Sequence, residues 1–190
     1  MLKNKIERKE AVLGVIGMGY VGLPLVITFG RAGFSMLGFD IDEEKVRRLN
    51  EGFSYIKHIR SSDIAEMVQS KRFMATTDFS RMKEADALLI CVPTPLTESR
   101  EPDLSFVIKT VKEIARHLRP GQLVILESTT YPGTTDEEVL PILEGSGLRV
   151  GKDFFLSFSP EREDPGNPDF DTQTIPKVVG GITDRCKEYA

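Results

Sequence analysis

The sequence predicts an α/β fold built on a doubly wound, mostly parallel sheet. Short apolar runs alternate with helical patterns along the whole chain, which places successive strands parallel to one another. Residues 87–92 form a continuous apolar run, as in a central strand covered on both faces. The first apolar run also leads directly into a glycine-rich turn and then a helix. Together these observations predict one domain with helices on both faces of a sheet.

The predicted elements follow one another in a regular order. Strands are expected at residues 11–16, 35–40, 73–76, 87–92, 123–126, 154–158 and 177–180. Helices are expected at residues 20–32, 42–50, 62–70, 104–117 and 134–144, with a short helix beginning at Asp78. Asp42 is the expected N-cap of the second helix, and Gly33 the expected end of the first. Residues 1–10 precede the domain of residues 11–190 as a polar arm.

Composition excludes several classes of function. The chain has 190 residues, 40% of them hydrophobic, and a net charge of −4 with acids and bases interspersed, so no nucleic-acid surface is expected. No apolar run approaches the roughly 20 residues that span a membrane. Cys91 and Cys186 lie far apart without ligand spacing, which predicts no metal site and fits a reducing cytoplasm.

The most informative motif is Gly-x-Gly-x-x-Gly, between the first strand and the first helix. Gly17 makes the tight turn, Gly19 lets a diphosphate approach the backbone, and Gly22 allows close packing of helix and strand. The N–H groups near Gly19, Tyr20 and Val21 are expected to face the phosphates at the positive end of the helix dipole. The motif therefore predicts a Rossmann dinucleotide-binding domain, the alternative being a tight turn in another α/β protein.

Asp40, at the end of the second strand, indicates which dinucleotide binds. A carboxylate there accepts hydrogen bonds from the ribose hydroxyls and repels a 2′-phosphate, which favours NAD over NADP. Asp42 is the second candidate for the ribose, but it lies beyond the strand end. Arg47 and Arg48 are better interpreted as residues of a solvated helix face than as ligands of a 2′-phosphate.

Five segments distant in sequence are expected to form one site. Each follows a strand, and ligands of such sheets bind beyond the carboxyl ends of the strands. These segments are Gly17–Gly22, Asp40, Cys91–Thr94, Ser128–Thr130 and Ser159–Glu161.

The motifs resemble the N-terminal domain of the UDP-glucose/GDP-mannose dehydrogenases. The resemblance covers roughly residues 11–181, nearly the whole chain, and is carried by residues 17–24, 91–95, 127–129 and 159–162. Residues 93–96 followed by 100–104, and residues 161–167, look closest to the bacterial UDP-N-acetylglucosamine 6-dehydrogenase branch.

The resemblance implies an enzyme that oxidises a sugar C6 alcohol to a carboxylate in two steps with two NAD. A cysteine thiol of the family forms a thiohemiacetal and then a thioester. The cofactor-binding positions implied for this chain are Gly17, Met18, Gly19, Tyr20, Val21 and Gly22 at the pyrophosphate, Asp40, Ile41 and Lys45 at the adenosine side, and Val92, Pro93, Thr94, Ser128 and Thr129 at the nicotinamide. Thr129 matches a threonine that helps to position a water, and Glu161 a glutamate with an acid–base role.

The chain departs from the family pattern in two respects. Many members carry a second glutamate four positions after the match to Glu161, where this chain has Pro165, so the role of Glu163 and Asp164 stays open. The resemblance also places the nucleophilic cysteine, a catalytic lysine, a dimerising central helix and the sugar-nucleotide domain beyond residue 190. We therefore expect the chain alone to bind NAD without turnover. We expect its full-length form to be a cytoplasmic homo-oligomer that uses a UDP-sugar for surface polysaccharide precursors.

Two alternatives remain from the sequence. One is another NAD-dependent enzyme, such as a hydroxyacid dehydrogenase, although His58 and His117 have no partner at a spacing that would make either a base. The other is a non-enzymatic NAD-binding module.

Overall fold

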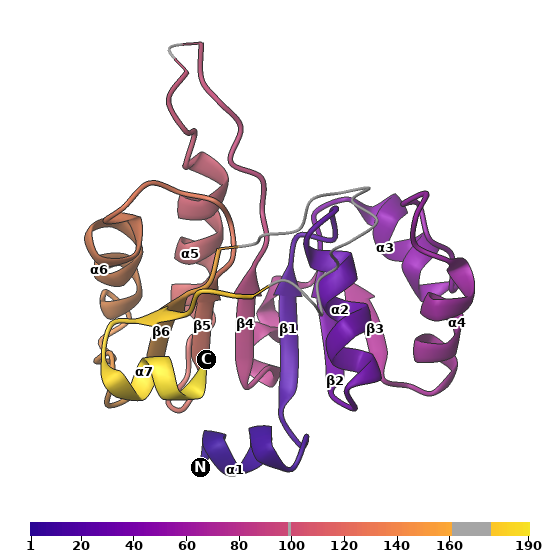
Figure 1. Cartoon of the computed structure of the whole chain (residues 1–190), viewed down its shortest axis with the longest axis horizontal. Coiled ribbons are helices and arrows are strands. Elements are labelled where there is room, and N and C mark those ends of the chain that lie inside the picture. The colour runs from indigo at the N-terminus through magenta and orange to yellow at the C-terminus, as the bar shows by residue number, and fades with distance from the viewer. Residues whose placement is uncertain (99, 161–175) are drawn as a thin grey trace.

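The computed structural model describes residues 1–98, 100–160 and 176–190, and these residues form one sheet flanked by helices (Figure 1). The strands lie in the order β3-β2-β1-β4-β5-β6-β7. Their bounds are β1 Val12–Ile16, β2 Ser35–Phe39, β3 Phe73–Thr76, β4 Ala87–Ile90, β5 Leu123–Leu126, β6 Phe155–Phe158 and β7 Gly180–Gly181. All neighbours from β3 to β6 pair in parallel, and β7 is antiparallel to β6. The doubly wound, mostly parallel sheet is confirmed.

Helices cover both faces of the sheet, because the chain winds outward from β1 in one direction and from β4 in the other. They are α1 Leu2–Glu7, α2 Gly22–Arg31, α3 Glu43–Asn50, α4 Ser61–Gln69, the 3₁₀ helix η1 Phe79–Glu84, α5 Ser105–His117, the π-helix η2 Thr134–Val139, α6 Leu140–Glu144 and α7 Asp184–Tyr189. Buried side chains of α2, α3, α4 and α7 pack in one hydrophobic cluster, and those of η1, α5, η2 and α6 in a second. The carboxyl ends of the parallel strands lie between the two layers of helices.

The helix expected at residues 134–144 is a π-helix followed by a short α-helix. Pro141 lies inside the expected helix, lacks an N–H group, and carries a ring that would collide with the carbonyl group four residues earlier in a continuous α-helix. The α-helical segment α6 accordingly begins at Leu140, so that Pro141 stands in its first turn.

The last strand differs from the expectation of residues 177–180. The described ladder comprises only Gly180 and Gly181, paired antiparallel with β6. The chain turns sharply after it, since a Cβ on Gly181 would lie 2.3 Å from the backbone nitrogen of Lys187 in α7. The pairing therefore ends where α7 folds back onto the sheet.

Residues 2–7 of the expected polar arm form helix α1, which lies at the amino end of β1 (Figure 1). Leu2 is buried, and the Lys5 Nζ donates to Asp86 Oδ1 at 2.8 Å. The Asp86 carboxylate also accepts from the Val12 N–H and from Arg119 Nη2. Burial alone would raise the pKa of Asp86, but these hydrogen bonds outweigh it and the pKa is lowered. This buried carboxylate therefore fastens α1 to the edge of the sheet opposite the strand carboxyl ends.

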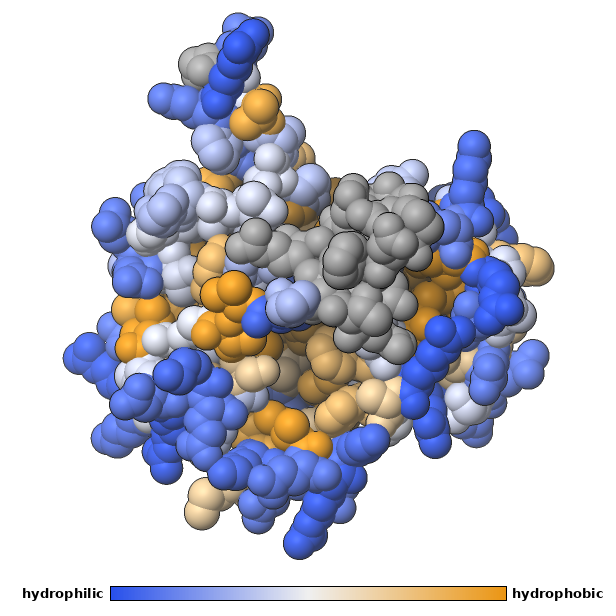
Figure 2. Space-filling view, in the orientation of Figure 1, coloured by the Kyte–Doolittle hydropathy of each residue, from blue (hydrophilic) through white to orange (hydrophobic). Residues whose placement is uncertain are grey.

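The surface is polar around its periphery. On the face seen in Figure 2, hydrophilic side chains surround hydrophobic ones that show nearer the middle. No helix among residues 1–98, 100–160 and 176–190 has the length and apolar character needed to cross a bilayer.

Candidate cofactor site

The glycine-rich turn is held by close backbone packing. Gly17 adopts a φ of +93°, and its N–H donates to the Phe39 carbonyl at 2.8 Å. A Cβ on Gly17 would lie 2.7 Å from the Cys91 carbonyl oxygen, and one on Gly22 would lie 1.9 Å from the Gly17 carbonyl oxygen. Two of the three glycines are therefore required by contact with backbone atoms.

Gly19 has a different environment. A Cβ at Gly19 would meet nothing within 4 Å, so the backbone there faces open space. Among the described residues, the N–H groups of Gly19, Tyr20 and Val21 donate to no backbone or side-chain acceptor. They lie just before the first residue of α2, where the dipole of a ten-residue helix favours negative charge. Unpaired donors beside open space at a helix N-terminus fit a diphosphate.

Asp40 links this turn to the neighbouring strand. Its Oδ2 accepts from the Met18 N–H at 2.9 Å, its Oδ1 accepts from the Asp42 N–H at 3.0 Å, and the carboxylate is only 8% exposed. The Lys45 Nζ lies 3.8 Å from Oδ2. Each carboxylate oxygen has a second lone pair, so Asp40 retains capacity to accept from ribose hydroxyl groups.

Asp42 has a structural role in α3. It is the N-cap of α3, as expected, and its Oδ1 accepts from the N–H groups of Glu44 and Lys45. Asp40 lines the adjacent cleft and Asp42 does not.

The ends of β4 and β5 are joined by side-chain hydrogen bonds. The Thr94 Oγ1 donates to the Thr129 carbonyl at 2.8 Å, and the Ser128 Oγ donates to the Val92 carbonyl at 2.7 Å. The hydroxyl groups of Thr94 and Ser128 are thus used to fix the two loops to each other. Thr129 keeps its own hydroxyl free of this pairing.

A cleft of about 630 Å³ connects these parts, which is within the usual range for ligand sites. It is lined by twelve of the predicted cofactor-binding residues: Gly17, Gly19, Tyr20, Val21, Asp40, Ile41, Lys45, Val92, Pro93, Thr94, Ser128 and Thr129. The predicted convergence of strand ends is therefore seen at four of the five segments. The fifth contains Glu161, which lies outside the described residues together with Glu163 and Asp164.

Two residues expected to contact the cofactor do not line the cleft. Met18 is fully buried, its N–H is used by Asp40, and its Sδ lies where a Cβ on Gly38 would approach within 2.7 Å. Gly22 lies beneath the turn, against Gly17. Both residues pack beneath the turn, so their contact with the cofactor stays a prediction.

Several residues that line the cleft were not predicted from the sequence. Phe106, Lys109 and Thr110 reach the cleft from α5, and Phe79 reaches it from the start of η1. The three α5 residues follow helical spacing on the side not used by buried Val107, so the signal was present as a second helix face. Their partners across the cleft could not be read from the chain.

A partly buried ion pair lies at the end of β5. Glu127, which lines the cleft, is 3% exposed, and its Oε2 accepts from the Lys177 Nζ at 2.7 Å. Lys177 belongs to the stretch that precedes β7, so the pair ties that stretch to the carboxyl edge of the sheet.

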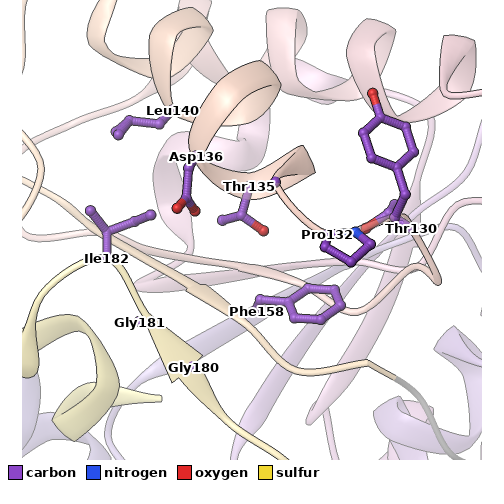
Figure 3. Close-up of a pocket in the computed structure, with 11 residues that line it drawn as sticks. Thr130, Pro132, Thr135, Asp136, Leu140, Phe158, Gly180, Gly181 and Ile182 are labelled. Carbon is purple, nitrogen blue, oxygen red and sulfur yellow. The ribbon is translucent and has the colours of Figure 1, made fainter.

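A second hollow of about 520 Å³ lies beside the cleft, between η2 and the ends of β6 and β7 (Figure 3). Thr130 and Pro132 border it next to Phe158, and Asp136 points toward it from η2. Its lining begins at Thr130, one residue after Thr129 of the cleft, in the loop that follows β5, so the two hollows are neighbours at the same edge of the sheet.

The chain matches a known protein family along most of its length. The model of the UDP-glucose/GDP-mannose dehydrogenase family, NAD binding domain, matches residues 11–190. UDP-N-acetyl-D-glucosamine 6-dehydrogenase of Pseudomonas aeruginosa is 36% identical over 181 residues, which are 95% of this chain and 42% of that protein. Protein CapL of Staphylococcus aureus is 39% identical over 173 residues, 90% of this chain and 39% of that protein. The chain thus spans about two fifths of the length of these relatives.

Solved structures agree. The NDP-N-acetyl-D-galactosaminuronic acid dehydrogenase of Methanosarcina mazei has a TM-score of 0.88 and 34% identity, covering 99% of this chain and 42% of that chain. The resemblance drawn from the motifs, the Rossmann-type fold and the choice of NAD as cofactor are confirmed by these comparisons.

Proposed function

Because the chain belongs to the UDP-glucose/GDP-mannose dehydrogenase family and matches its NAD-binding domain, we propose that it binds NAD for the oxidation of a UDP-N-acetylhexosamine at C6. The product is the corresponding uronate, and two NAD are reduced per sugar. Relatives named for UDP-N-acetyl-D-glucosamine and UDP-N-acetyl-D-mannosamine support this choice of sugar. The observation that carries the proposal is the cleft in which free amides, Asp40 and the two threonine-bearing loops meet.

In this proposal each end of the cleft holds a different part of NAD. The N–H groups of Gly19, Tyr20 and Val21 bind the diphosphate, and Asp40 accepts from the adenosine ribose. Lys45 lies near enough to Asp40 to help order the same hydroxyl groups. The backbone donors give affinity without a basic patch, in keeping with the net charge of −4.

The nicotinamide end is formed by the loops that follow β4 and β5. Val92, Pro93, Thr94, Ser128 and Thr129 line it, and their mutual hydrogen bonds keep that wall rigid. NAD supplies the hydride acceptor when bound. The protein's part is to hold the ring against these loops, with the Thr129 hydroxyl available to orient a water. Glu161 remains the proposed acid–base group.

We further propose that residues 1–190 alone bind the cofactor without turnover, because no cysteine here matches the family nucleophile. Cys91 is buried at the strand end and Cys186 is buried in α7. The complete enzyme would then act in the cytoplasm as a homo-oligomer and supply precursors of a surface polysaccharide.

Titration with NADH and NADPH tests the proposal directly. NADH should bind the purified chain and NADPH should bind much more weakly, with NADH fluorescence or calorimetry as the readout. A turnover assay with UDP-N-acetylglucosamine and NAD should show no NADH formation. Absence of NADH binding would refute the cofactor assignment, and appreciable sugar oxidation would refute the expectation that a further part of the enzyme is needed.

A further inference from the structure

Tyr55 lies in the connection between α3 and α4, yet it contacts the glycine-rich turn. Its hydroxyl group donates a hydrogen bond to the carbonyl oxygen of Met18, which is 37 positions away in the chain. The ring is half-buried against the same hydrophobic cluster that contains the side chains of α2 and α4. The contact therefore joins an irregular connection to the backbone that leads into the phosphate-facing amides.

Met18 is held from the other side as well. Its N–H donates to Asp40 Oδ2, and its side chain is fully buried over Gly38. With both flanking peptide groups and the side chain fixed, Met18 has little freedom to rotate. Tyr55 supplies the contact on the peptide group that continues toward the cleft.

The contact from Tyr55 also determines the direction of the Gly19 N–H. The Met18 carbonyl and the Gly19 N–H belong to one planar peptide, and in a trans peptide they point in opposite directions. No described peptide bond is cis. Holding the carbonyl against Tyr55 thus directs the Gly19 N–H away from Tyr55, on the side where Gly19 borders the cleft. It also keeps a carbonyl oxygen from facing a diphosphate.

The connection that contains Tyr55 is itself held by hydrogen bonds. The Ser54 N–H donates to Ser61 Oγ at 3.0 Å, and Arg48 Nη2 donates to the Ser54 carbonyl at 3.1 Å. A second contact reaches the same turn, since the rings of His58 and Tyr20 stack with centroids 6.1 Å apart. Burial, followed by the charges of Asp40 and Asp42, raises the pKa of Tyr55, so its hydroxyl stays protonated and able to donate.

We propose that Tyr55 is a positioning residue for the cofactor diphosphate, acting through the Met18–Gly19 peptide. This inference rests on the proposed function, because it deepens how the same cleft binds NAD. Tyr55 touches no cofactor atom in this account. It sets the direction of an amide that does, and a hydrogen bond to the carbonyl also polarises the amide as a donor.

The test is Tyr55→Phe, which keeps the ring and removes only the hydroxyl group. Binding of ADP, NADH and adenosine is measured by calorimetry, with NMR titration for the weakest ligand, and urea unfolding is run in parallel. The dissociation constants of ADP and NADH should rise about 3- to 10-fold, the equivalent of one hydrogen bond. Adenosine lacks phosphates, so its affinity should not change. The Gly19 amide resonance should shift in the variant without ligand.

Tyr189→Phe is the matched control. Tyr189 packs on the same cluster, with its ring centroid 4.4 Å from that of Phe155, and it lies outside the cleft. This substitution also removes one hydroxyl group, and it should leave the affinities for ADP, NADH and adenosine unchanged.

The possible outcomes distinguish failure of the positioning role from failure of the proposed function. Unchanged ADP binding by Tyr55→Phe overturns the positioning role, and so does an equal loss for ADP and adenosine, which would indicate general loosening of the cleft. If the unaltered protein binds neither NADH nor ADP, the proposed function itself fails, and the positioning role fails with it.

Discussion

Replacing Asp40 by asparagine should weaken both the fold and the discrimination between NADH and NADPH. The carboxylate uses one oxygen for the Met18 N–H and the other for the Asp42 N–H, at 2.9 and 3.0 Å. An asparagine side chain has one oxygen, so its NH₂ group must face one of these two donors. Leaving a buried donor unsatisfied costs about 1–3 kcal/mol, and the free energy of unfolding should fall by that amount.

The effect on binding follows from the charge. Hydrogen bonds to a charged acceptor contribute about 1.5–3 kcal/mol, so loss of the carboxylate should raise the dissociation constant of NADH roughly tenfold to a hundredfold. NADPH binding should suffer less, since the repulsion of the 2′-phosphate is also removed. The ratio of the two dissociation constants, measured by calorimetry beside urea unfolding, therefore moves toward one.

Asp42→Asn is the control for this experiment. Asparagine is as good an N-cap as aspartate, so α3 and the cofactor preference should both be retained. The reasoning is wrong if Asp42→Asn collapses the preference for NADH while Asp40→Asn leaves it intact.

Three further predictions concern the turn and the opposite edge of the sheet. Gly22→Ala places a Cβ 1.9 Å from the Gly17 carbonyl oxygen and should lower the free energy of unfolding by about 2 kcal/mol or more, seen as a reduced urea midpoint. Gly19→Ala meets open space, so it should change the free energy of unfolding by no more than about 1 kcal/mol but remove most of the NADH affinity; intact binding would contradict the diphosphate assignment. The lowered pKa of Asp86 stabilises the fold fully above its ordinary value of 3.8, and this stability is lost as the pH falls through the folded-state pKa. Acid unfolding of Asp86→Asn should therefore show a shallower pH dependence than the unaltered protein, and identical slopes would rule out this role.

Local patterns predicted the turn and its surroundings well. Gly17 and Gly22 are each required by a contact within the strand–turn–helix unit itself or at the adjacent strand end, so their spacing carries the information. Asp40 was predicted from its place after an apolar strand, and the structure puts it in the cleft. The N-cap at Asp42 likewise depends on the next three residues alone.

Features that depend on distant partners were not predicted. Tyr55 lies in a connection without periodicity, and its contact with Met18 exists only because α3 and α4 fold the chain back over the turn. The hydrogen bond from the Met18 N–H to Asp40 likewise joins residues 22 positions apart. The residues of the ion pair, Glu127 and Lys177, are 50 positions apart, and the local sequence around either one does not predict the other.

By itself, the sequence determined the alternation of strands and helices, the glycine-rich turn and the acid that follows the next strand. These depend on hydrophobic period, backbone sterics and turn chemistry, which act over a few residues. Only the tertiary structure decided which groups beneath and across the cleft meet, because those contacts arise when winding order and helix packing bring remote segments together. The supporting roles of Met18 and Tyr55, and the α5 wall of the cleft, belong to that second kind.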